Sequence, residues 1–112
     1  MAQDTPVRRP AVRAVTFADV ATALARLIPI ALPPTRAGET GASPKVADFL
    51  LAWWNGGDNG HFPVLHLCNL DETIAEDMLT ILAYLAQNPV IYADQWGYRD
   101  TMAVIYARYR GE

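Results

Sequence analysis

The sequence has little cysteine, with Cys68 as the single one among 112 residues. One cysteine cannot form a disulfide within the chain, so nothing in the sequence requires an oxidising compartment. We therefore expect a cytoplasmic protein.

Lysine and arginine are absent between Val46 and Tyr98. Residues 1–44 carry five arginines and three acids, a net of +2, whereas residues 45–112 carry four bases and nine acids, a net of −5. Contacts to phosphates require Lys and Arg, so this acidic core is not expected to bind nucleic acid directly. Its charge instead suits a protein partner with a basic surface.

No apolar run is long enough to span a membrane. The stretch 18–32 is apolar, but Asp19, Arg26 and Pro29 interrupt it well short of the roughly 20 clean residues that a span needs. We expect no membrane partner.

The composition is that of a folded domain, with 52% apolar and 19% charged residues. Apolar residues recur at helical spacing in four segments that proline and glycine separate, and there is no internal repeat. We predict an all-α fold, a small single-domain bundle of about four helices with irregular connectors. Residues 1–15 are expected to be an extended or mobile arm, residues 16–43 the first helix and a Pro/Gly-rich linker, and residues 44–112 the helical core domain.

The first two helices have recognisable start signals. Thr16 should cap the first, with Asp19 in its first turn, and Pro29 should stop it. Ser43 followed by Pro44 predicts the start of the second. The core is expected between the second, third and fourth helices, and the sequence leaves open whether the first packs on it or is loosely attached.

The second helix should be central, because its apolar residues cover two faces and would be touched on two sides. These residues are Val46, Phe49, Leu50 and Trp53 on one face, and Ala47, Leu51 and Trp54 on the other. The stretch WWNGGDNGHFP (residues 53–63) should end this helix at Asn55 to Gly57 and then turn the chain.

The third helix should begin after Asn69 or Asp71 and end at Asn88, and the fourth should run from about Tyr98 to Tyr109. The connector PVLHLCNL is expected to be irregular, with His66 and Cys68 as buried packing residues. The residues expected to face inward are Ile74, Met78, Ile81, Leu82 and Leu85 on the third helix, and Met102, Ile105, Tyr106 and Tyr109 on the fourth.

Three blocks of the sequence, VADFLLAWWN (46–55), TIAEDMLTIL (73–82) and GYRDTM (97–102), resemble a short, functionally uncharacterised domain family of proteobacteria that is associated with mobile elements. The resemblance covers roughly residues 44–110 and leaves the arm and the first helix outside. The connector HFPVLHLCNLD departs from the more polar connector of that family. Because the family has no assigned activity, the resemblance implies no catalytic residue.

Three side chains that can bind a metal ion lie close together in the sequence, namely His61, His66 and Cys68. Asp58 and Asp71 are nearby. Zinc accepts such ligands, but structural zinc motifs bring two short ligand pairs from separate segments, and that spacing is missing here. Cys68 also lacks an identifiable oxyanion device or third group for nucleophilic catalysis. We therefore predict no catalytic residue, metal or cofactor, and keep a metal-binding or thiol enzyme centred on these residues as the alternative.

The favoured interpretation is a non-enzymatic, acidic protein-binding module. Adjacent tryptophans on a helix diverge by about 100°, so Trp53 and Trp54 cannot fill one pocket, and one should lie at the edge of the core. Such an aromatic edge beside an acidic surface suits a contact site, and a mobile-element accessory or a counter-defence (anti-CRISPR-like) inhibitor of a host nucleic-acid-processing complex is its concrete version. Self-association through the tryptophan face stays open. The predicted partner-binding residues are Trp53, Trp54, Asp71, Glu72, Glu76 and Asp77.

Overall fold

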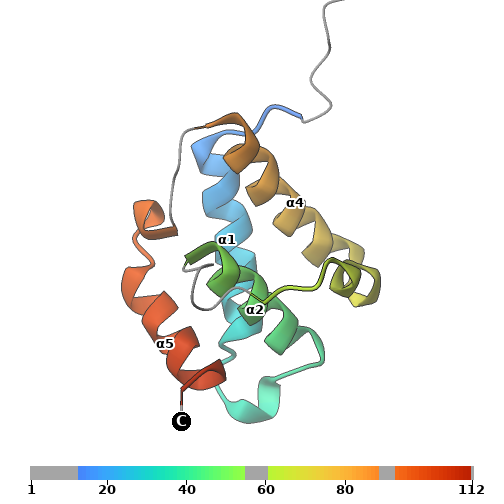
Figure 1. Ribbon diagram of the computed structural model, residues 1–112. Helices are drawn as coiled ribbons and strands as arrows, with labels where there is room; N and C mark the ends of the chain where they lie inside the picture. Colours follow the sequence, from blue (N-terminus) through green and yellow to red (C-terminus); the bar gives the residue numbers. More distant parts are fainter. Residues whose placement is uncertain (1–12, 55–60, 89–92, 112) are drawn as a thin grey trace, which may run out of the picture.

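The computed structural model describes residues 13–54, 61–88 and 93–111, and these residues form an all-helical bundle without a strand (Figure 1). The predicted fold class is thus confirmed. The α-helices are α1 (Phe17–Ala31), α2 (Ala42–Trp54), α4 (Glu72–Gln87) and α5 (Arg99–Tyr109), and the 3-10 helices are η1 (Arg36–Gly38), η2 (Val64–Asn69) and η3 (Ala93–Trp96).

Helix α1 lies in the middle of the bundle, packed against both α2 and α4. Its apolar face is buried, and Leu24 and Leu27 are fully so. Full burial of a leucine contributes about 1.5–3 kcal/mol before conformational entropy is counted. The first helix is therefore part of the core, and the expected core of three helices was incomplete.

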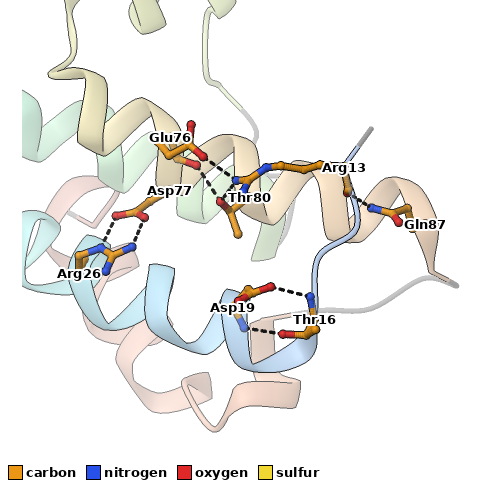
Figure 2. A network of polar contacts seen from close by, with 8 residues as sticks. All are labelled: Arg13, Thr16, Asp19, Arg26, Glu76, Asp77, Thr80 and Gln87. Atoms are coloured by element: carbon orange, nitrogen blue, oxygen red, sulfur yellow. Dashed lines mark hydrogen bonds and ion pairs between the residues drawn. The ribbon is translucent and has the colours of Figure 1, made fainter. Parts of the chain in front are cut away.

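Thr16 caps α1 as predicted, and Asp19 completes the cap as a reciprocal capping box (Figure 2). The Asp19 backbone N–H donates to the Thr16 hydroxyl at 3.1 Å, and the Thr16 N–H donates to the Asp19 carboxylate at 2.9 Å. The bond from the Thr16 backbone, followed by that from its hydroxyl, lowers the pKa of Asp19. Two amide donors that the helix leaves unpaired are thus satisfied.

The expected stop of α1 at Pro29 is wrong, because the helix continues through it to Ala31. A proline removes one backbone donor, but the N–H of Leu32 still donates to the carbonyl of Ile28 at 2.8 Å. Ala31 is fully buried, so packing of the last turn offsets the lost bond. The helix ends where Pro33 and Pro34 follow.

The cap of α2 is Thr40, and the expected cap at Ser43 is wrong. The Thr40 hydroxyl accepts from the Ala42 N–H at 3.2 Å, and the Ser43 hydroxyl accepts from the Thr40 N–H at 2.9 Å. Ser43 therefore lies inside the first turn as the reciprocal partner of the cap. The central position of α2 is confirmed, since it packs against α1 on one side and α5 on another.

Helices α4 and α5 complete the bundle. The residues predicted to face inward on these two helices were only partly correct. Met78, Ile81, Met102 and Ile105 are fully buried as expected. Leu82 is 45% exposed and Tyr106 40% exposed, so their inward orientation was wrong. Asn88 ends α4 as expected, and its side chain donates to the carbonyl of Tyr84 at 2.7 Å.

The short helix η3 fastens the start of α1 through Trp96, where the sequence indicated only a connector. The Trp96 ring stacks on Phe17 with centroids 4.5 Å apart, and its indole N–H donates to the Phe17 carbonyl at 3.1 Å. Its edges meet Tyr84 of α4 and Trp53 of α2. One side chain thus joins three helices.

Candidate functional site

An apolar pocket of about 500 Å³ lies between α2, η2 and α4. Helical spacing brings the three side chains of each α-helix to the same wall. The 3-10 helix η2 and Phe62, which lies two residues before it, close the remaining side. The lining residues are Phe49, Ala52 and Trp53 from α2, Phe62, Val64 and Leu67 from the η2 region, and Met78, Leu82 and Leu85 from α4.

The rim of this pocket is exposed to an unusual degree for apolar side chains. Val64, which lines it, is 76% exposed, and its neighbour Leu65 is exposed to the same extent. Inside, the Phe49 and Phe62 rings meet edge to face at 5.4 Å, which fixes one wall. No charged residue from the described part of the chain lines the pocket, so it suits an apolar group.

The two adjacent tryptophans point to different parts of the bundle, as their helical spacing predicts. Trp53 lines the pocket and meets Trp96 at 5.5 Å, whereas Trp54 meets Tyr106 of α5 at 6.4 Å. Both are half-buried. Only Trp53 belongs to the pocket.

The acidic residues of α4 lie on another side of that helix, in a polar groove of about 510 Å³ lined by Arg26, Glu72, Thr73, Glu76 and Asp77. Asp77 is only 4% exposed, and Arg26 donates to both of its oxygens, at 2.9 and 2.6 Å (Figure 2). The hydrogen bond to Asp77 and its charge raise the pKa of Arg26. Asp77 was predicted to belong to an acidic surface, but it is buried and its charge is balanced within the molecule.

Arg13 lies in the segment that precedes α1 and neutralises a second acid of α4, Glu76. Its guanidinium forms an ion pair with Glu76 at 2.7 Å and donates to the Thr80 hydroxyl, while its carbonyl accepts from the Gln87 amide at 2.7 Å (Figure 2). The end of the expected N-terminal arm is thus fastened along α4. Residues 1–12 of that arm lie outside the described residues.

The structure therefore separates the six predicted partner-binding residues. Trp53 lines the apolar pocket, Trp54 faces α5, and Glu72, Glu76 and Asp77 line the polar groove. Asp71 is exposed just before α4, and its side chain makes no capping bond.

The sequence did not predict the exposure of Val64, which lines the pocket, or of Leu65, which follows it in the chain. The short apolar run in which they lie was interpreted only as packing. The length of this connector could have indicated their exposure, because a short apolar segment cannot bury side chains on both of its sides.

The metal-capable residues are spread rather than clustered. His61 and Cys68 are exposed, so the expected burial of Cys68 is wrong. His66 is half-buried against Phe62, with ring centroids 5.7 Å apart, and its buried Nδ1 has no hydrogen-bond partner in the described part of the chain. Across residues 13–54, 61–88 and 93–111, no group of three His, Cys, Asp or Glu residues could hold a metal ion. Asp58 and the turn predicted after Trp54 lie outside these ranges.

Comparison with known proteins places the chain in a family without assigning an activity. No curated protein and no solved structure matches it significantly. No helix among the described residues has both the length and the apolar character needed to cross a membrane. The match to a family starts earlier than the expected resemblance and includes most of α1. Residues 21–110 match the family described as a family of unknown function (DUF7673), and the chain therefore belongs to this uncharacterised family.

Proposed function

We propose that the protein is a non-enzymatic binding module that receives a bulky apolar side chain of a protein partner. The observation that carries this proposal is the 500 Å³ pocket between α2, η2 and α4, with exposed Val64 at its rim. Contiguous exposed apolar surface is rare on monomers and marks interaction sites. Aromatic residues in such pockets, here Trp53 and Phe62, commonly supply most of the binding energy.

The lining favours a protein partner over a small metabolite. Sites for small molecules add a few converging polar groups to an apolar wall, since these groups fix the orientation of the ligand. Among the described residues, the nine that line the pocket are all apolar or aromatic, and Leu65, which follows Val64 in the chain, is also an exposed apolar side chain. A leucine or an aromatic side chain that projects from a partner surface requires only an apolar pocket and no polar groups to orient it.

The charge of the surface supports a basic partner, though with fewer acids than the sequence suggests. Glu76 and Asp77 are paired with Arg13 and Arg26. Asp71 and Glu72 are exposed and form no ion pair within the described residues. These two carboxylates would increase the association rate with a basic partner more than the final affinity.

The finer proposal is a mobile-element accessory, or a counter-defence (anti-CRISPR-like) factor that inhibits a host nucleic-acid-processing complex. It is supported by the net charge of −3, by the stretch free of Lys and Arg between Val46 and Tyr98, and by the sequence resemblance. Because two acids are internally neutralised, such an inhibitor would act by filling an apolar contact of its target and not by displaying a row of phosphate-like charges.

The test is a comparison of Ala52→Phe, which fills the pocket from the wall of α2, with Ala103→Phe on the exposed side of α5. Each protein is immobilised and exposed to a nuclease-treated lysate of a proteobacterial host. We expect the unmodified protein and Ala103→Phe to retain the same partner. Ala52→Phe should bind that partner at least tenfold more weakly, which corresponds to about 1.4 kcal/mol. Equal retention by both variants would exclude the pocket as the contact.

A second readout tests the finer proposal. The captured partner should belong to a nuclease or another nucleic-acid-processing complex, and adding the purified protein should slow its cleavage reaction. Ala52→Phe should not slow it. Capture of a partner that does not act on nucleic acids would reject the inhibitor role and leave the binding module in place.

A further inference from the structure

Helix α4 carries a second apolar face, which we call the α4 stripe, formed by Ala75, Leu79, Leu82 and Ala86. Leu79 is 48% and Leu82 45% exposed, and Ala86 is also exposed. Their spacing of four, three and four residues is the one that packs a helix against another helix. On a helix that already buries Met78 and Ile81, this face is in excess of what the bundle needs.

The other sides of α4 are occupied. Met78 and Ile81 face the core, and Arg13 and Arg26 cover the acids on the polar side. No other described element covers Leu79 and Ala86, whereas Leu82 also borders the apolar pocket and Ala75 is half-buried. Helix α4 runs along the outer edge of the bundle (Figure 1).

The order of residues in the stripe identifies its occupant. Alanine, leucine, leucine and alanine read the same in both directions about the midpoint between Thr80 and Ile81. Two antiparallel copies of α4 related by a two-fold axis at that midpoint would place Ala75 opposite Ala86 and Leu79 opposite Leu82 of the other copy. A two-fold interface must be self-complementary, and this stripe meets that condition.

We propose that the α4 stripe is a homodimer interface in which two copies of the chain pack their α4 helices antiparallel. The alanines at both ends let the helices approach closely, and the leucines fill the centre. The stripe shares Leu82 with the lining of the apolar pocket, but the interface does not require the pocket to be occupied.

Charge selects the antiparallel arrangement. Asp71 and Glu72 lie at the start of α4, and its end carries the uncharged Gln87 and Asn88. A parallel pair would place like charges beside each other, whereas an antiparallel pair places each acidic start beside a neutral end. The helix dipoles also attract only in the antiparallel pair.

Sedimentation of three proteins tests the interface. Leu79→Lys places a charge in the stripe without touching the pocket lining, and Val104→Lys makes the same kind of change at an exposed residue of α5. We expect the unmodified protein and Val104→Lys to form dimers at high concentration, and Leu79→Lys to raise the dissociation constant more than tenfold. Circular dichroism checks that each variant is folded. If Leu79→Lys does not fold, Ala86→Arg replaces it as the variant of the stripe. A monomeric unmodified protein, or dimers that both stripe variants keep, would overturn the proposal.

Engineered cysteines test the orientation in a Cys68→Ser background. Positions 75 and 86 are eleven residues apart, about 16 Å along a helix, which is too far for a disulfide within one chain. On mild oxidation, a mixture of Ala75→Cys and differently tagged Ala86→Cys chains should link to each other, and neither should link efficiently to itself. Ala75→Cys chains that link to themselves would indicate a parallel pair, and linking no faster than that of Val104→Cys would overturn the interface.

Discussion

At the scale of single residues, Asp77 is a carboxylate taken out of water and balanced by a neighbouring helix. It is 4% exposed and bound through both oxygens by Arg26, whose own side chain is largely exposed. The Coulomb attraction of such a pair offsets the cost of dehydrating the carboxylate, so its net contribution to stability is small. Removing one partner has a much larger effect, because a buried charge then stays unpaired.

We therefore expect Arg26→Met to lower the free energy of unfolding more than Arg36→Met does, because it leaves the buried carboxylate of Asp77 without its partner. Adding Asp77→Leu to the same chain should recover most of that loss. Arg36→Met is the control, because Arg36 is exposed and lies 3.7 Å from Glu39, where a pair contributes about 0–1 kcal/mol. Urea unfolding followed by circular dichroism measures all four proteins. A loss in the double variant equal to that in Arg26→Met would contradict the argument.

The sequence predicted the direction of a side chain where the geometry of a single helix determines it. It did not predict burial that depends on a second helix. The divergence of Trp53 and Trp54 follows from helical geometry alone and is seen in the structure. The burial of Asp77 depends on Arg26, 51 residues earlier, and no local pattern reports that pairing.

At the scale of elements, the junction of η3 and α5 depends on one backbone conformation. Gly97 has a φ of 85°, which side chains with a Cβ adopt at a cost, and no atom within 4 Å would hinder an added Cβ. The cost of a substitution there is thus one of backbone strain alone.

Gly97→Ala should lower the free energy of unfolding by about 1–2 kcal/mol. Gly41→Ala is the matched control, since an added Cβ meets no atom within 4 Å there either and the φ of Gly41 lies outside the left-handed range. We expect that control to be neutral, or stabilising by about 0.4–1 kcal/mol through the unfolded chain. Thermal unfolding measures both, and equal effects of the two substitutions would contradict the assignment of strain.

The number, order and approximate place of the helices could be predicted from apolar periodicity and from proline and glycine punctuation. Their ends could not, because Pro29 is overridden by the burial of Ala31 and the start of α2 is capped by Thr40, three residues before the expected Ser43. The apolar pocket was also unpredictable, since it requires the relative placement of α2, η2 and α4.

At the scale of the whole molecule, α1 is part of the core that the other helices share. It packs on both α2 and α4, and five of its residues are buried in the shared core, namely Val20, Ala23, Leu24, Leu27 and Ala31. The expected division into a first helix with linker and a separate core domain assigned α1 no such role. The match to the family from residue 21 onward fits the larger unit.

A fragment of residues 40–112 should accordingly fail to fold, because it would leave Met78 and Ile81 without the apolar face of α1. A fragment of residues 13–112, which keeps α1 and the ion pair of Arg13, should unfold cooperatively like the full chain. Circular dichroism during heating distinguishes the two. A cooperative transition in the shorter fragment would show that residues 44–112 form an independent domain.

The three tryptophans of the chain lie at three different junctions, and this makes the protein its own optical reporter. Trp53 borders the apolar pocket, Trp54 contacts Tyr106 of α5, and Trp96 stacks on Phe17 at the start of α1. Chains that retain one tryptophan each would follow occupation of the pocket, movement of α5 and release of α1 as separate fluorescence signals, without an attached dye.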